Sequence, residues 1–149
     1  MGLIKYNSQP LSVYDFKNNI LRDFYRTFVE SEGFDHEAIN ALCADTNEIT
    51  VIKMLAHYDQ NLKMAIAQVA LGLREGRNDL VEKAAHKLIG TSELLGFRAF
   101  AIHSRELTQM IRNHEPQEKI SATGQRYLNR CAELFKTLDS NCPSLKIHL

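Results

Sequence analysis

The sequence predicts an all-α protein: an antiparallel four-helix bundle with an additional N-terminal helical segment. Three observations support this fold class. Apolar residues recur at intervals of three and four along nearly the whole chain, which is the spacing of amphipathic helices. Valine and isoleucine are scattered rather than gathered in alternating runs, so strands are not expected. The prolines, Pro10, Pro116 and Pro143, all lie where a helix is expected to begin or end.

The N-terminal third predicts two helices that precede the bundle. The first begins at about residue 12 and is expected to end near Gly33, because glycine is favoured just past a helix end. Its apolar residues stand four positions apart, at Phe16, Ile20, Phe24 and Phe28. A shorter helix follows from Asp35. We expect the aromatic stripe to pack on the protein's own core, with a dimer surface or a partner groove as the alternative. Residues 1–45 are therefore assigned to a helical extension packed on the bundle.

Four long amphipathic helices joined by short turns are expected to form the bundle across residues 46–139. Residues 45–48, DTNE, have the spacing of a capping box and open the first of them, which ends at Gly76. Asn78 or Asp79 is expected to cap the second helix, which runs to about Gly96. The third spans roughly residues 98–113, and Pro116 suits the first position of the fourth. Residues 140–149 are expected to be a loose C-terminal tail.

Composition excludes several classes of protein. Eighteen basic residues balance eighteen acidic ones, so no overall field favours a nucleic acid or an anionic membrane as partner. The three cysteines form no CxxC pair, and their odd number argues against a disulfide framework, which favours a cytoplasmic location. No apolar run approaches the about 18 residues that span a bilayer, and the chain starts without a signal-peptide pattern. We expect no bound cofactor or metal, because the histidines form no HxxxH or HExxH pair and no phosphate-binding loop is present.

One predicted helix carries a histidine and a glycine on its polar side. At about 100° per residue, one face is apolar, formed by Val81, Ala84, Ala85, Leu88, Ser92 and Leu95. His86 lies about 180° from Leu95 and is expected to face solvent. Gly90 stands one turn further along, where a glycine costs the helix about 1 kcal/mol relative to alanine. We interpret this glycine as access for a partner to the imidazole. An exposed histidine without a role, and helix packing at the glycine, are the alternatives.

The segment AAHKLIGTSELLGF resembles the signature of histidine-containing phosphotransfer (HPt) domains, A-H-x-L-K-G-S-S-x-x-L-G. The matching residues are Ala85, His86, Leu88, Gly90, Ser92, Leu95 and Gly96, and Thr91 replaces a serine. The resemblance covers about residues 50–113 clearly and the last helix in outline, and it leaves residues 1–45 unexplained. It implies that His86 accepts a phosphoryl group on Nε2 from a receiver-domain aspartate and passes it to another receiver.

The resemblance also implies the partners, which are response-regulator receiver domains and a hybrid sensor histidine kinase. Mg²⁺ is then expected on the receiver alone, and this chain is a phosphoryl carrier rather than an ATP-dependent kinase. We favour a monomer over a dimer. The main alternative is a non-transferring helical module that docks a receiver or a kinase without being phosphorylated at His86.

Two positions depart from the family pattern. Where most members carry a lysine three residues after the histidine, this chain has Ile89, and where many carry a glutamine on the next helix it has Thr108. We expect Ile89 to add an apolar docking contact and the Thr108 hydroxyl to orient the imidazole. Lys83 and Lys87 are expected to supply local positive charge. Losing one charge-assisted contact costs about 1.5–3 kcal/mol, so transfer is expected to be slower than in typical members.

Overall fold

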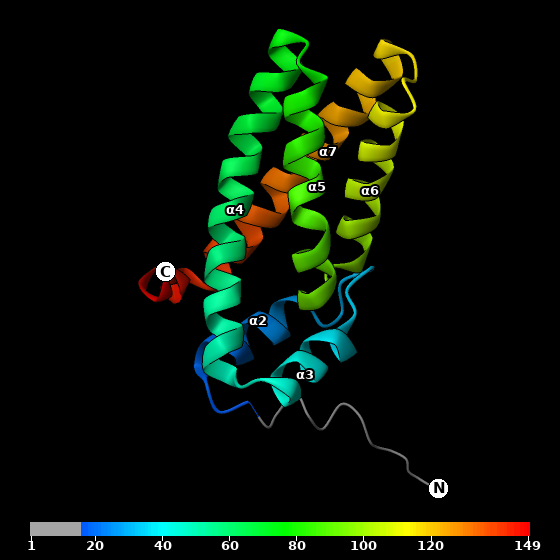
Figure 1. Ribbon diagram of the computed structural model, residues 1–149. Helices are drawn as coiled ribbons and strands as arrows, with labels where there is room; N and C mark the ends of the chain where they lie inside the picture. Colours follow the sequence, from blue (N-terminus) through cyan, green and yellow to red (C-terminus); the bar gives the residue numbers. More distant parts are fainter. Residues whose placement is uncertain (1–15) are drawn as a thin grey trace, which may run out of the picture.

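The computed structural model of the protein describes residues 16–149, and this part of the chain is built from helices and turns without a β-strand (Figure 1). The elements in chain order are α2 (Asn19–Phe28), α3 (His36–Asp45), α4 (Glu48–Glu75), α5 (Asn78–Leu95), α6 (Arg98–Arg112), α7 (Gln117–Asn141) and the 3₁₀ helix η1 (Pro143–His148). The all-α prediction is confirmed. Within the described range, no helix is both long and apolar enough to cross a membrane.

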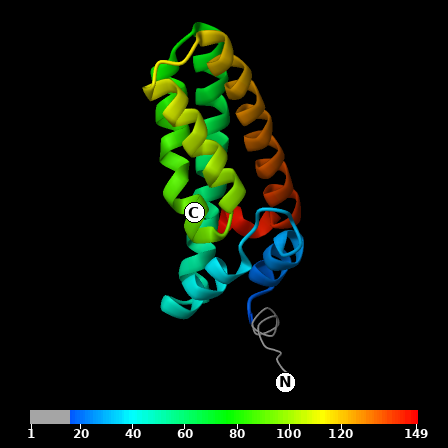
Figure 2. The same cartoon turned by 90° about the vertical axis from the view of Figure 1, so that its right-hand side faces the viewer.

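The four longest helices lie side by side, and successive ones run in opposite directions (Figures 1 and 2). Helix α4 contacts α5 and α7, and α6 contacts the same two helices. Helices α2 and α3 cover the end where α4 begins and α5 ends (Figure 1). Buried side chains of α2 and α3 belong to the same hydrophobic cluster as those of the long helices. The N-terminal segment therefore shares one core with the rest of the described chain.

The first described helix differs from its predicted bounds. Residues 12–15 of the predicted helix lie outside the described range, and α2 begins only after Asn18, whose side chain accepts a hydrogen bond from Ile20 N at 2.8 Å. The helix ends at Phe28, so the predicted end near Gly33 is wrong. The aromatic stripe nevertheless packs inward as expected, since Phe16 and Phe24 are buried.

Gly33 makes a close approach to the α5–α6 turn instead of ending a helix. Its φ is +83°, and a Cβ there would lie 2.3 Å from the Cβ of Ala99. The Gly33 carbonyl accepts a hydrogen bond from Ala99 N at 3.0 Å, and Asp35 N donates to the Gly96 carbonyl at 2.7 Å. Around these bonds, the ring of Phe97 contacts aromatic rings from α2 and from the loop after it. The N-terminal segment thereby fixes the turn that follows α5.

The helix ends were predicted better than the helix starts. Gly76 and Gly96 both adopt the left-handed conformation just past α4 and α5, as expected. The start of α4 is capped by Asn47, whose side chain accepts from Thr50 N at 2.8 Å, so the predicted capping box is wrong. Its glutamate, Glu48, instead accepts hydrogen bonds from backbone N–H groups that precede α2.

The starts of α5 and α7 also differ from prediction by one or two residues. The cap position of α5 is Arg77, and no side chain caps this helix. Asp79 forms an ion pair with Arg77 at 2.8 Å rather than capping the helix. Pro116 lies at the cap position of α7 instead of its first helical residue.

The C-terminal residues are packed, so the expectation of a loose tail is wrong. Cys142 and Leu145 are buried, and η1 contacts both α4 and α7. These two residues stand three positions apart, which places them on one side of a 3₁₀ turn. The C-terminal segment therefore covers the part of the core between α4 and α7.

A buried carboxylate lies beneath this C-terminal segment. Asp59 of α4 is 5% exposed, and its Oδ1 has no hydrogen-bond partner in the structure. Burial raises the pKa of Asp59 to about 6, and the nearby Asp139 carboxylate adds to this rise, while Lys146 and Lys63 oppose it. Because the pKa of Asp59 in the folded state lies above the ordinary aspartate value of 3.8, the folded state binds this proton more tightly than the unfolded chain. The free energy of unfolding therefore falls as pH rises from about 4 to above 6, because Asp59 must then be buried in its ionised form.

We expect Asp59→Asn to stabilise the protein at about pH 7.5, by up to about 3 kcal/mol, since it removes the cost of burying an ionised carboxylate. At about pH 4.5 the effect is expected to be much smaller, because Asp59 is then largely protonated in the folded state. Chemical denaturation of both proteins at the two pH values measures the difference. An equal effect at both would contradict the assigned pKa shift.

Candidate functional site

His86 stands near the middle of α5 with its side chain exposed to solvent. The opposite side of this helix is buried, and its buried residues are the predicted stripe of Val81, Ala84, Ala85, Leu88, Ser92 and Leu95. The division of α5 into a core face and a histidine face is therefore confirmed. Lys83 and Lys87, three residues before and one residue after His86, are exposed, and Ile89 is half-buried.

A buried hydrogen bond fixes the rotation of α5 about its axis. The Tyr58 hydroxyl of α4 and the Ser92 Oγ of α5 lie 2.7 Å apart, and both residues are fully buried. The Tyr58 ring also stacks on Phe97 with the two ring centroids 5.3 Å apart. Burial raises the pKa of Tyr58, so its hydroxyl stays protonated and available to Ser92 at neutral pH. If α5 rolled outward it would leave these polar groups unpaired in the core, and His86 consequently keeps its outward direction.

Gly90 leaves open space beside His86. A Cβ built on Gly90 would meet nothing within 4 Å. Gly72 of α4 differs, because a Cβ there would lie 2.7 Å from Val81 Cγ2 and 2.9 Å from the Arg77 carbonyl oxygen. Gly72 is thus a packing glycine, whereas packing within the described chain does not explain Gly90. The interpretation of Gly90 as an access point is consistent with this geometry.

Two ion pairs between α5 and α6 bracket the histidine. The Nε of Arg112 donates to Glu82 Oε2 at 2.8 Å, one turn before His86. The guanidinium of Arg105 donates to Glu93 Oε2 at 3.0 Å, two turns after it. These arginines could not be predicted from the sequence, because they are 30 and 12 residues from their partners along the chain. Only the register of α6 against α5 brings them to this face.

Thr108, which was expected to orient the imidazole, makes a hydrogen bond within its own helix. Its side chain is buried, and its hydroxyl donates to the Arg105 carbonyl of its own helix at 2.8 Å. A threonine inside a helix often bonds back to a carbonyl of the preceding turn, which occupies the proton that was expected to reach His86. Thr108 is thus a buried residue of α6, and its role in orienting the imidazole stays a prediction.

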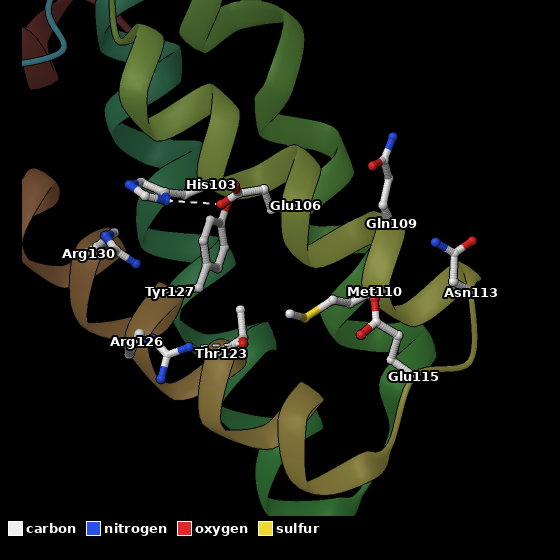
Figure 3. Close-up of a pocket in the computed structure, with 10 residues that line it drawn as sticks. All are labelled: His103, Glu106, Gln109, Met110, Asn113, Glu115, Thr123, Arg126, Tyr127 and Arg130. Atoms are coloured by element: carbon white, nitrogen blue, oxygen red, sulfur yellow. Dashed lines mark hydrogen bonds and ion pairs between the residues drawn. The ribbon is translucent and has the colours of Figure 1, made fainter.

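The other histidines are also candidates for metal ligands or binding-site residues. Among residues 16–149, no group of three histidine, cysteine or acidic side chains is placed to hold a metal ion. His103 of α6 lies 3.5 Å from Glu106 through its Nδ1 and is half-buried rather than fully solvated. It lines a groove of about 410 Å³ between α6 and α7, on which Arg126 and Arg130 also lie (Figure 3). No residue of α5 lines this groove, so it is separate from the His86 face.

No protein-family model, curated protein or solved structure matches this chain. The residues around His86 are therefore the basis for inferring a function. This site offers an exposed imidazole, open space next to it, two exposed lysines and two ion-paired arginines. Such a site can present a nitrogen nucleophile to a second macromolecule and can hold negative charge that arrives with it.

We expect Gly90→Ala to raise the free energy of unfolding by about 1 kcal/mol, because alanine is the better helix former and its Cβ meets no neighbour. Gly72→Ala is the matched control within a helix. It is expected to destabilise, since its Cβ would press on Val81 and on a backbone carbonyl. Thermal or chemical denaturation measures both, and a destabilising Gly90→Ala would show that the space is occupied.

Proposed function

We propose that this protein is an HPt phosphotransfer protein, in which α4, α5, α6 and α7 form an antiparallel four-helix bundle. His86 accepts a phosphoryl group from the aspartyl phosphate of one receiver domain and passes it to the aspartate of another. The observation that supports this most directly is the exposed imidazole of His86 beside the open space at Gly90. The HPt-like motif around these two residues, AAHKLIGTSELLGF, supports the same function.

The transfer step needs a nucleophile and positioning rather than a cofactor on this chain. Histidine serves because its uncharged form, with a free nitrogen lone pair, is populated near neutral pH. The Nε2 lone pair attacks phosphorus, the new N–P bond forms, and the P–O bond to the receiver breaks so that its aspartate leaves as a carboxylate. The phosphorylated ring keeps its Nδ1 proton and gains a positive charge, which balances the step. Mg²⁺ and the acidic pocket belong to the receiver.

The surroundings of His86 suit a partner with an acidic pocket. Lys83 and Lys87 are exposed next to it, and their charge complements the aspartates of a receiver. The side chain of Leu94, two turns beyond His86, is 51% exposed and offers an apolar contact together with the half-buried Ile89. The absence of a side chain at Gly90 lets the two surfaces come close enough for in-line attack.

The direct test is to mix the protein with a receiver domain carrying a labelled aspartyl phosphate. Wild type is expected to take an acid-labile, base-stable label, while His86→Gln takes none. Binding of the receiver by both proteins without label on wild type would favour the non-transferring docking module. Label on His86→Gln would assign the nucleophile to another residue.

Ile89→Lys is expected to lengthen the lifetime of phosphorylated His86 about tenfold, because a lysine at this position leans back toward the imidazole and pairs with the phosphoryl group. The rate of loss of label, measured after removal of the receiver, reports this lifetime. Leu94→Lys is the matched control: it adds the same charge to α5, but from two turns beyond His86. An unchanged or shorter lifetime in Ile89→Lys would contradict the role given to position 89.

A further inference from the structure

The ion pair between Glu82 and Arg112 lies on the side of α5 toward which His86 leans. Side chains on a helix tilt toward its N-terminus, so the imidazole of His86 covers the turn that contains Glu82, four residues earlier. Both Nε and a terminal nitrogen of Arg112 contact the same Glu82 oxygen. The guanidinium is therefore held beside the turn over which the imidazole extends.

The second ion pair has the opposite relation to His86. Glu93 lies seven residues after the histidine, and the imidazole tilts away from it. Arg105 pairs with Glu93 at 3.0 Å, and its exposure is similar to that of Arg112, at 44% against 54%. The two pairs tie the same helices together with the same chemistry. They differ in their position along α5 relative to the site.

We propose that Arg112 exchanges partners when His86 is phosphorylated, leaving the Glu82 carboxylate for the phosphoryl group. This inference rests on the proposed phosphotransfer function and names a positive group for the phosphorylated state. A phosphoryl group carries more negative charge than a carboxylate and presents three acceptor oxygens to the planar fork of a guanidinium. Glu82 therefore pairs with Arg112 in the unphosphorylated protein, and in the phosphorylated protein it competes with the phosphoryl group for the Arg112 guanidinium.

Competition predicts opposite effects for the two halves of one ion pair. Arg112→Gln removes the cation and is expected to shorten the lifetime of phosphorylated His86 about three- to tenfold. Glu82→Gln removes the competing carboxylate and is expected to lengthen this lifetime about two- to fivefold. Both variants break the same tie between α5 and α6, so a merely structural role would move the lifetime in the same direction in both.

The experiment uses the full chain and phosphoramidate, a small phosphoryl donor that releases ammonia and needs no docking surface. Label on His86 is followed over time in wild type, Arg112→Gln and Glu82→Gln. Arg105→Gln and Glu93→Gln are the matched controls, which break the other ion pair and are expected to leave the lifetime within about twofold of wild type. Thermal unfolding of all five proteins checks that they are folded.

The outcomes separate this inference from the proposed function. Opposite shifts in Arg112→Gln and Glu82→Gln, with unchanged controls, support the exchange. Equal shifts in Arg112→Gln and Arg105→Gln, or a shorter lifetime in Glu82→Gln, overturn it while leaving phosphotransfer intact. If wild-type His86 takes label neither from phosphoramidate nor from a phosphorylated receiver, the proposed function is overturned, and the exchange of Arg112 with it.

Discussion

The outward direction of His86 depends on how α5 is seated in the core. Six buried residues along one side of this helix leave little choice about which side faces solvent. The hydrogen bond between Tyr58 and Ser92 makes the seating specific, because a rolled helix would bury two hydroxyl groups without partners. The serine that looks like part of a phosphotransfer motif therefore acts from the interior. It fixes the direction of the histidine from inside the core.

The sequence was informative where local spacing decides the structure. The periodicity of apolar residues predicted the buried side of α5, and glycines predicted the ends of α4 and α5. These features depend on residues within one or two turns of each other, so they can be deduced from a single chain. The exposed position of His86 belongs to the same class, which is why the most important part of the candidate site was predicted.

Features that depend on distant residues could not be predicted in this way. Glu48 had the spacing of a capping residue, but its carboxylate binds backbone N–H groups about thirty positions earlier in the chain. Arg112 joins the site only through the register of α6 against α5, and Leu145 is buried only because α4 and α7 leave room for it. The hydrogen bond of Thr108 to the Arg105 carbonyl is local, but whether a buried threonine bonds to its own helix also depends on its tertiary neighbours.

The contact between Gly33 and the α5–α6 turn bears on where this protein can be divided. Asp35 and Gly33 satisfy backbone groups of Gly96 and Ala99 that would otherwise lack partners at that turn. The ring of Phe97 is covered largely by aromatic residues that come before α4. A fragment cut just ahead of α4 would expose this ring and leave those groups to water. A fragment that folds on its own is therefore expected to include α2 and the loop after it, as well as the four long helices.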